Sequence, residues 1–313
     1  MGEYSKKLGE KCEDRLFYLL SCFGWEKGGT NVDVSGIENK LMGIDAFYSY
    51  VDPLLEKRIG ILAEAKTRSY KYLDRKLFDD TLKSMVEKIS TLPYTDDFNE
   101  KLNIHHAGLT NTGFIGFWTH DGFNQEKYHN LLTNTEIPKK RIGQRIFIAG
   151  NKDIQKFISI LETREKIKSL KDNIDRKCDV CYPCLTNSVP VELDLLSLEM
   201  LYSAYIFCTH TETKTVGGSE HVSKHLDILY FDEIKLEALD LMCLAINTYQ
   251  LLKDIVQVNL YIYEPNGKGE RDGTINAFKD NWMKSEKNRN IIINVMPMYS
   301  KSEDLMEWGG LVD

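Results

Sequence analysis

The stretch from residue 41 to residue 67 reads LMGIDAFYSYVDPLLEKRIGILAEAKT, and it decides the fold of the N-terminal part of the chain. It opens with an aromatic-rich run over residues 41–50, passes a turn-forming Asp-Pro pair, and continues with a nearly apolar run over residues 58–67. Two short apolar runs on either side of a turn signal predict neighbouring strands, most simply a hairpin. The second run stays apolar up to Glu64, which is typical of a strand buried on both faces.

Three charged residues in this stretch are candidates for chemistry. Asp45 lies on the first predicted strand, whereas Glu64 and Lys66 lie on the second. Because side chains alternate along a strand, Glu64 and Lys66 point to the same face. Charged groups at the end of an apolar strand are costly unless they serve a metal ion or each other. The two carboxylates offer the oxygen ligands that Mg²⁺ or Mn²⁺ prefers, and the lysine is placed to position or deprotonate an attacking water molecule.

The surrounding sequence alternates between helical and extended patterns, which predicts an α/β domain over residues 1–172. Apolar residues recur at spacings of three and four in the predicted helices, and Gly24 ends the first of them. A glycine pair within residues 28–31 predicts a turn. The predicted helices cover residues 5–23, 71–91, 124–133 and 152–170, and the further strands cover residues 113–118 and 145–150.

The remainder, residues 173–313, is predicted to be a separate acidic α+β domain. Residues 1–170 carry 26 Lys and Arg against 24 Asp and Glu, whereas residues 171–313 carry 14 against 23. The net charges of +2 and −9 suggest two parts with different roles. The patterns in the second part predict a linker or small module at residues 171–187, a helix at residues 232–254, and strands at residues 226–231, 256–264 and 290–297.

The overall composition predicts a globular protein. The chain has 313 residues, of which 42% are hydrophobic and 28% charged, with only 7 Pro and a net charge of −7. That balance excludes a uniformly basic nucleic-acid coat but allows a local basic groove. The polar N-terminus lacks a signal peptide, and no run approaches about 18 consecutive apolar residues, so we expect a cytoplasmic protein without a membrane span.

The residues around this stretch resemble the core of the PD-(D/E)XK nuclease superfamily, which has the restriction-endonuclease-like fold. Glu64-Ala65-Lys66 matches the (D/E)XK half of the motif, and Asp45 matches the Asp of the other half, with Ile44 where Pro often stands. Glu13 on the first predicted helix matches the helix-borne acidic residue of Holliday-junction-resolvase-like and Mrr-like members. The resemblance implies an αβββαβ core and a Mg²⁺- or Mn²⁺-dependent endonuclease that hydrolyses DNA phosphodiester bonds. It implies metal binding by Asp45 and Glu64, catalysis by Lys66, and support of the metal-bound water by Glu13; Asp33 is a weaker rival of Asp45.

A nuclease core joined to an acidic domain is similar to nucleases of bacterial phage-defence systems. The analogy implies an antiviral role together with a second protein subunit from a neighbouring gene, in a homo-oligomer or hetero-oligomer. Two alternatives are a non-catalytic nucleic-acid-binding or scaffold protein that retains the nuclease fold, and a zinc-stapled interaction protein. Basic residues near the predicted site are candidates for contacts to DNA phosphates. They are Arg68, Lys71, Arg75, Lys76, Lys139, Lys140 and Arg141.

Cysteines cluster at the start of the second part. Cys178, Cys181 and Cys184 lie within seven residues, a spacing that suits Zn²⁺ or an iron–sulfur cluster. Cys208 and His210 are the nearest candidates for a fourth ligand. The further candidates are His221 and His225, and Cys12 or Cys22 would take part in an iron–sulfur cluster. The alternative is a group of reduced, partly buried cysteines that binds no metal.

Overall fold

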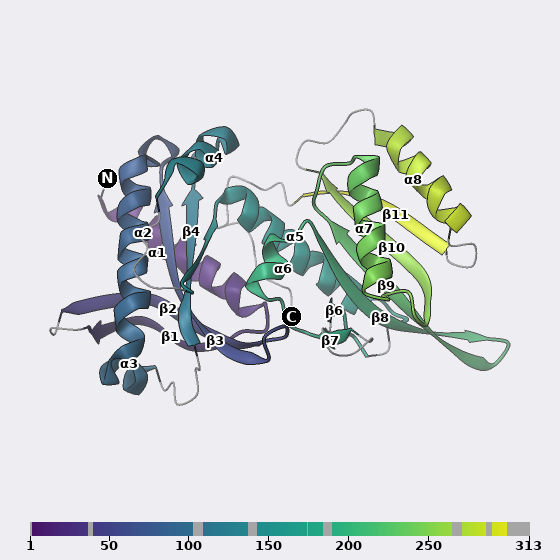
Figure 1. Ribbon diagram of the computed structural model, residues 1–313, viewed down its shortest axis with the longest axis horizontal. Helices are drawn as coiled ribbons and strands as arrows, with labels where there is room; N and C mark the ends of the chain where they lie inside the picture. Colours follow the sequence, from purple (N-terminus) through teal and green to yellow (C-terminus); the bar gives the residue numbers. More distant parts are fainter. Residues whose placement is uncertain are drawn as a thin grey trace. The chain divides into compact units, whose positions relative to one another are not determined.

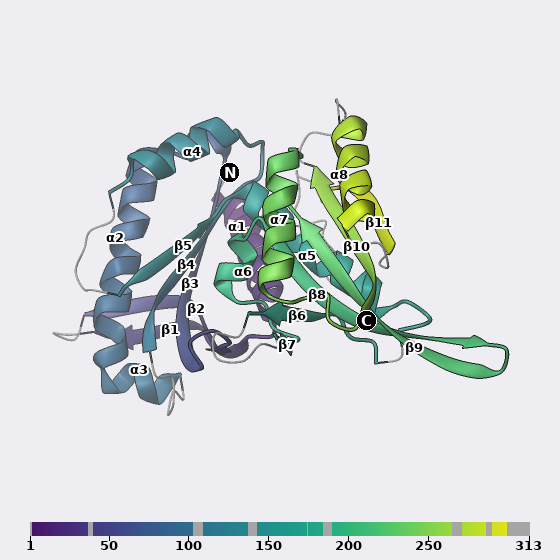
Figure 2. The ribbon, with the colours of Figure 1, turned by 45° about the vertical axis from the view of Figure 1, so that its right-hand side comes forward.

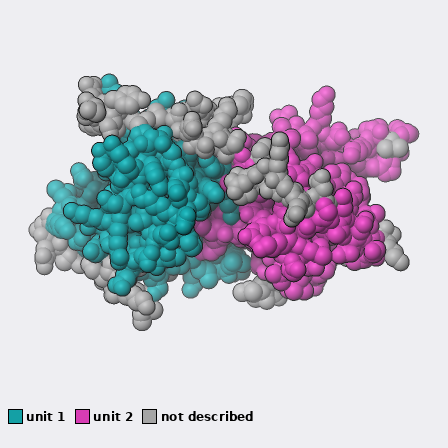
Figure 3. Space-filling view, turned by 90° about the horizontal axis from the view of Figure 1, so that it is seen from above, with its two compact units in different colours: residues 1–157, 301–313 teal, residues 158–300 magenta. Residues whose placement is uncertain are grey.

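The computed structural model describes residues 2–36, 40–102, 109–136, 143–173, 175–183, 190–264, 271–285 and 290–298. The chain forms two compact units, and their described residues fall within 1–157 and 158–300 (Figure 3). Each unit is built around one mixed β-sheet (Figure 1). Within the described residues, no helix is long and apolar enough to cross a membrane.

The first unit holds a sheet with the order β1-β2-β3-β4-β5. Strands β1, β2 and β3 pair antiparallel, whereas β3, β4 and β5 pair parallel. The strands are β1 (Glu26–Ser35), β2 (Leu41–Asp52), β3 (Lys57–Arg68), β4 (Leu109–Thr119) and β5 (Arg145–Ala149). The helices are α1 (Gly2–Ser21), α2 (Arg75–Thr91), α3 (Asp96–Lys101), α4 (Gln125–Asn134) and the beginning of α5 (Asn151–Lys168), with short 3₁₀ turns at Tyr70–Tyr72 and Leu92–Tyr94.

Helices α1 and α2 pack on opposite faces of this sheet. Two glycines of β4 mark the close approaches: a Cβ at Gly116 would meet Leu16 of α1, and one at Gly113 would meet Met85 of α2. The two glycines are three positions apart, so they point to opposite faces of the strand. The α2 face carries the main core of this unit, in which Phe78 stacks on Phe117. The sheet is therefore buried on both sides, as the apolar β3 sequence predicts.

The second unit holds a sheet with the order β11-β10-β9-β8-β6-β7. Helices α7 and α8 cover one face, where Leu239, Met242 and Phe278 join the core. The other face meets the later part of α5, because Thr163 and Tyr263 share a hydrogen bond. The strands are β6 (Asp179–Tyr182), β7 (Val191–Leu193), β8 (Tyr205–Val216), β9 (Ser219–Tyr230), β10 (Ile255–Glu264) and β11 (Asn290–Pro297), and the helices are α6 (Leu198–Tyr202), α7 (Leu236–Thr248) and α8 (Arg271–Ser285).

The two sheets share one topology. In the second unit β6, β8 and β9 pair antiparallel, and β9, β10 and β11 pair parallel, which repeats the pattern of β1 to β5. A helix precedes each set, a helix connects the third strand to the fourth, and another connects the fourth to the fifth. Strand β7 and helix α6 are additions to this plan. Strands β8 and β9 also extend together as a long hairpin beyond the rest of their sheet (Figure 2).

Several sequence-based predictions need correction. The turn predicted at residues 28–31 is wrong, because β1 runs through it; a register shift between Lys27 and Gly29 and the positive φ of Asn31 accommodate the glycine pair. The linker or module predicted at residues 171–187 is wrong in its described part, where β6 is a strand of the second sheet. The predicted helix at residues 232–254 is shorter, since α7 ends at Thr248. Strands β7 and β8 and helices α3, α6 and α8 were not predicted.

Candidate active site

The β2–β3 hairpin places the charged residues at the point where its two strands stop pairing. Ala46 pairs with Ala63, and Asp45 and Glu64 are the next residues outward on the two strands. Beyond this point β3 continues to pair with β4, where Glu64 lies opposite Ile115 and Lys66 opposite Phe117. A buried, regular strand therefore fixes both residues of the Glu-x-Lys motif.

Asp45, Glu64 and Lys66 converge in the structure. The Lys66 Nζ atom lies 2.6 Å from Glu64 Oε1 and 3.8 Å from Asp45 Oδ2. The backbone N–H of Ala65 donates a hydrogen bond to Asp45 Oδ2 at 3.3 Å. The Glu64 side chain is only 6% exposed, whereas the side chains of Asp45 and Lys66 are each 24% exposed. The group is thus anchored at Glu64 and open to solvent at the other two residues.

Lys88 of α2 is a fourth member of this group that the sequence analysis missed. Its Nζ atom lies 3.1 Å from Glu64 Oε2, so each oxygen of the Glu64 carboxylate has a lysine partner. Lys88 lies three residues after Met85 and one before Ile89, both of which are buried. A lysine within the apolar stripe of a helix is the signal that could have identified it, since that position faces the sheet.

The pKa values of the two carboxyl groups move in opposite directions. Burial raises the pKa of Glu64, but the charges of Lys66 and Lys88 outweigh burial and hold it below its ordinary value. Burial raises the pKa of Asp45, and the charge of Glu64 adds to this effect against the opposing charge of Lys66. Glu64 consequently stays ionised to lower pH, whereas Asp45 is protonated more readily than an ordinary aspartate.

Glu13 faces the same group from α1. Burial raises the pKa of Glu13, and the charge of Asp45 raises it further, while Lys66 acts in the opposite direction. The carboxylates of Glu13, Asp45 and Glu64 do not all come within 4.8 Å of one another. Glu13 is therefore coupled to the site through its electrostatic interaction with Asp45 and Lys66. Asp33, the rival of Asp45, lies on β1, the strand at the edge of the sheet, and pairs with Gly43 of β2.

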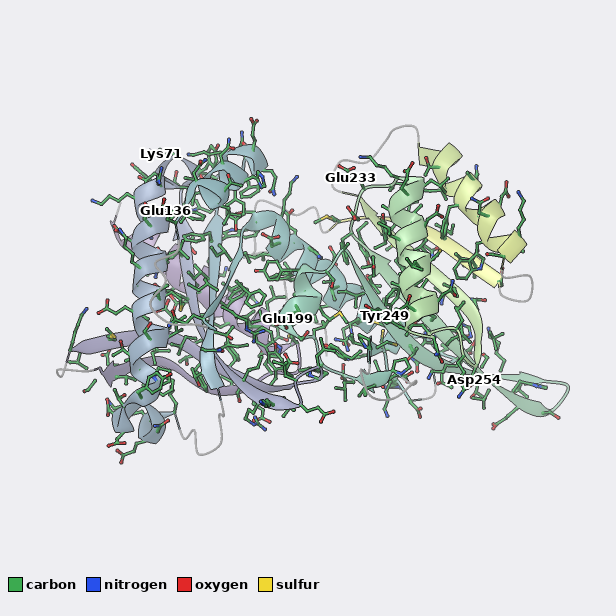
Figure 4. All side chains as sticks on the ribbon, in the orientation of Figure 1. Lys71, Glu136, Glu199, Glu233, Tyr249 and Asp254 are labelled. Atoms are coloured by element: carbon green, nitrogen blue, oxygen red, sulfur yellow. The ribbon has the colours of Figure 1, made fainter. Side chains whose placement is uncertain are left out.

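The basic residues proposed for DNA contacts are exposed where the structure describes them. Arg68 ends β3, and Lys71 and Lys76 lie near the beginning of α2, as Figure 4 shows for Lys71. Arg75 is engaged in an ion pair with Asp79 at 3.6 Å. Lys139, Lys140 and Arg141 lie outside the described residues.

The cysteines do not assemble into the predicted metal site where they are described. Cys178 and Cys208 are in contact, and the hydrogen bond between them together with burial raises the pKa of the Cys178 thiol. Cys181 belongs instead to the core beneath α7, where burial raises its pKa to about 12. No three ligand atoms among the described cysteines converge on one point. The structure gives a zinc site at Cys178, Cys181 and Cys208 no support, and Cys184 lies outside the described residues.

Taken together, the αβββαβ order of the first unit and the convergence of Asp45, Glu64 and Lys66 define a nuclease-like α/β domain. A family model confirms this class: residues 1–153 match the GAPS4 protein PD-(D/E)XK nuclease domain. These residues therefore form a PD-(D/E)XK nuclease domain, and the restriction-endonuclease-like fold predicted for them is confirmed. A comparison with curated proteins gave no match.

The residues present fit a hard divalent cation. Mg²⁺ in proteins is held by one or two carboxylates and retains several water molecules. Asp45 and Glu64 supply two carboxylates side by side, and solvent reaches the partly exposed Asp45. In the structure the lysines balance the charge of the buried Glu64 carboxylate, a balance that a bound cation would also provide.

Proposed function

We propose that this protein is a metal-dependent endonuclease that hydrolyses DNA phosphodiester bonds. The observation that carries the proposal is the convergence of Asp45, Glu64 and Lys66 at the open end of the β2–β3 hairpin, within a PD-(D/E)XK nuclease domain. Asp45 and Glu64 would hold Mg²⁺ or Mn²⁺. The bound ion would polarise the scissile phosphate and lower the pKa of the attacking water.

The chain's own residues then have distinct roles. Glu64 binds as an anion because its lysine partners keep its pKa low. Lys66 lies between the two carboxylates, where it orients the water and stabilises the negative charge that develops on the phosphate. Glu13 interacts electrostatically with Asp45 and Lys66, and through this interaction it would support the metal-bound water. Lys88 is a positioning residue, since it contacts Glu64 while its own side chain is only 13% exposed.

The exposed basic residues support a nucleic-acid substrate, which we propose to be DNA. Arg68, Lys71 and Lys76 follow the Glu-x-Lys strand directly and are solvent-accessible. Such residues bind phosphates without reading sequence, and their contribution weakens as the salt concentration rises. The acidic second part of the chain suits a protein partner better than DNA. We infer from this, and from the GAPS4 family match, a role in phage defence together with a second subunit.

The test is a cleavage assay on supercoiled and linear plasmid DNA with Mg²⁺, with Mn²⁺ and with EDTA. The full-length protein is assayed alone and with the product of the neighbouring gene. We expect metal-dependent cleavage that Lys66→Ala and Glu64→Gln each reduce by about 100-fold or more, as loss of acid–base or charge-stabilising groups does. Lys57→Ala is the matched control, because Lys57 is an exposed lysine at the other end of the same strand.

Two outcomes would overturn the proposal. One is a folded wild-type protein that cuts DNA in no combination of metal and partner, which would favour the non-catalytic binding protein. The other is cleavage that persists at the wild-type rate in Lys66→Ala. Cleavage of RNA but not DNA under the same conditions would keep the catalytic site and correct the substrate.

A further inference from the structure

The sheet of the second unit carries a cluster of polar residues that is not part of the proposed nuclease site. His210 and Glu212 lie two positions apart on β8, so both point to the same face. His225 lies opposite His210 on the neighbouring strand β9. One ligand atom from each of His210, Glu212 and His225 lies within 4.8 Å of the other two. Among the described residues, this is the one set of three such side chains that comes together.

The cluster is buried, yet one of its polar atoms has no protein partner. His210 is 3% exposed and His225 is 4% exposed. His225 Nε2 lies 3.6 Å from Glu212 Oε2 and 3.1 Å from the Ser223 hydroxyl, whereas its buried Nδ1 atom has no hydrogen-bond partner. Buried polar atoms in native proteins are nearly always satisfied, so the unpartnered Nδ1 of His225, in a ring that packs against the His210 imidazole and lies near the Glu212 carboxylate, points to a missing partner.

A second carboxylate orients His210 from behind. The Nδ1 atom of His210 contacts Asp227, and its Nε2 atom lies 3.3 Å from Glu212 Oε1. Asp227 is fully buried and accepts a further hydrogen bond from the Asn259 side-chain amide at 2.9 Å. This is the arrangement around metal-binding histidines, in which the nitrogen away from the metal donates to a carboxylate that is itself held by hydrogen bonds. The Asp227 contact holds the ring through Nδ1, so that Nε2, which meets Glu212 in the structure, would be the atom that binds a metal ion in place of its proton.

We propose that His210, Glu212 and His225 bind a divalent transition-metal ion of the zinc class. Two imidazoles and one carboxylate form a nitrogen–oxygen ligand set that suits Zn²⁺, whereas Mg²⁺ prefers an all-oxygen set. Three protein ligands leave one tetrahedral position for water or an external ligand. This site is distinct from the carboxylates of the nuclease domain and from the predicted cysteine site, and it does not rest on the proposed nuclease function.

The surroundings of the cluster allow a metal ion to enter. Lys214 forms an ion pair with Glu212 at 2.9 Å, but its side chain is 57% exposed and can move into solvent when a cation binds.

The segment after α5 is tied to the same part of β8, because Asn173 forms a bridge with Glu212 and the Thr213 N–H donates to the Asp172 carbonyl. Binding would therefore fasten strands β8 and β9 and this segment to one another.

The test measures metal binding by the full-length chain. The protein is stripped with a chelator and titrated with Zn²⁺ in the presence of excess Mg²⁺, with binding followed by calorimetry and by elemental analysis after gel filtration. We expect one equivalent of Zn²⁺ to be retained in the wild type and lost in His225→Gln and Glu212→Gln. Asp227→Asn should weaken binding by about 10- to 100-fold, as changes behind a ligating histidine do.

Controls separate this site from others in the chain. His221→Gln is the matched control, because His221 is an exposed histidine on the same strand, and it should retain the equivalent. Glu64→Gln should also retain it. Replacement of Zn²⁺ by Co²⁺ gives a second readout: nitrogen and oxygen ligands produce the visible absorption of tetrahedral cobalt without a thiolate-to-cobalt charge-transfer band.

Three outcomes would overturn the proposal. They are a wild-type protein that retains no Zn²⁺, binding that survives in both His225→Gln and Glu212→Gln, and a cobalt spectrum with thiolate bands whose intensity falls in Cys178→Ser. If the two ligand variants fail to fold, the wild-type cobalt spectrum and the retained stoichiometry of His221→Gln still decide the matter.

Discussion

At the residue scale, the site is governed by how two lysines share one buried carboxylate. Lys66 comes from the strand that carries Glu64, and Lys88 comes from α2, the helix that packs on the same face of the sheet. Burial of Glu64 alone would favour its protonated form, and the two ammonium groups reverse that preference. Removal of either lysine therefore favours protonation of Glu64 and also changes the position of the Glu64 side chain.

Lys88→Met should raise the pKa of Glu64, because one of the two charges that lower it is lost. If cleavage requires ionised Glu64, the acidic limb of the pH–rate profile moves to higher pH in this variant. Lys83→Met is the matched control, since Lys83 is an exposed lysine of the same helix, and its profile should coincide with the wild type. Coincident profiles for Lys88→Met and the wild type would contradict the role given to Lys88.

The same ion pairs make a pH-dependent contribution to stability. The pKa of Glu64 lies below its ordinary value of 4.5 in the folded chain, so its pairing stabilises the fold above that value. The contribution is lost as the pH falls through the lowered folded pKa. The difference in unfolding free energy between the wild type and Lys88→Met should therefore be largest near neutral pH and shrink on acidification, as denaturant titrations at several pH values would measure.

The sequence identified Asp45, Glu64 and Lys66 but not Lys88 for a physical reason. The first three stand out because they interrupt or end apolar strands, and their spacing is local. Lys88 is 24 residues from Glu64, and a lysine in a helix usually lies on the solvated face. Only the packing of α2 on the sheet reveals that this lysine meets a buried carboxylate.

At the element scale, strands with long apolar runs could be predicted from the sequence, whereas a strand with a glycine pair and a strand with a polar run could not. The predicted strands at residues 41–50 and 58–67 correspond to β2 and β3, and the predicted helix at residues 152–170 to α5. Strand β1 was missed because its paired glycines suggest a turn, although a register shift accommodates them. Strand β8 was missed because its apolar run ends at Cys208, and from Thr209 onward threonines alternate with His210, Glu212 and Lys214, so that no long apolar pattern marks the strand.

The packing of α1 on β4 gives a prediction at this scale. Gly116→Ala would place its Cβ 2.3 Å from Leu16 Cδ2, and Leu16 is buried, so we expect a loss of about 1–3 kcal/mol of unfolding free energy. Gly9→Ala is the contrasting variant in α1: nothing lies within 4 Å of the added methyl group, and alanine in a helix interior is worth about 0.5–1 kcal/mol over glycine.

Denaturant titration of both glycine variants checks the prediction, with the slope of the transition showing whether the unfolded state has changed. Opposite signs for the two substitutions are expected. A stabilising Gly116→Ala would mean that α1 does not approach β4 as closely as the structure shows.

At the scale of the whole molecule, the repeated topology does not repeat the proposed catalytic residues. Asp45 is the fifth residue of β2, and Glu64 and Lys66 are the eighth and tenth of β3. The fifth residue of β8 is Thr209, and the eighth and tenth of β9 are Leu226 and Ile228. Thr209 and Leu226 lie opposite each other, and both Leu226 and Ile228 are fully buried in the core. The second unit thus has the strand plan without the acidic and basic side chains.

The strand order of the second sheet could not be predicted from the sequence. The polar β8 and the short β6 did not appear as strands, so the order that makes the second sheet a counterpart of the first was hidden. Strand order and parallel pairing depend on contacts between residues far apart in the chain, which local periodicity does not report. The net charge of −9 over residues 171–313 could be obtained from the sequence, because charge depends on composition alone.

The described residues hold one set of the proposed catalytic residues, which has a kinetic consequence. In the proposed function, a single Asp45, Glu64 and Lys66 group would hydrolyse one phosphodiester bond at a time, whereas breaking a duplex requires a cut in each of two antiparallel strands. The second cut must come from a second chain or from renewed binding. With limiting protein and supercoiled plasmid, we therefore expect nicked circles to accumulate before linear DNA. In a dilution series, the rate of nicking should rise in proportion to protein concentration and the rate of linearisation more steeply. Linear product that forms without a nicked intermediate, at a rate proportional to protein concentration, would instead show that the chains cut as preassembled pairs.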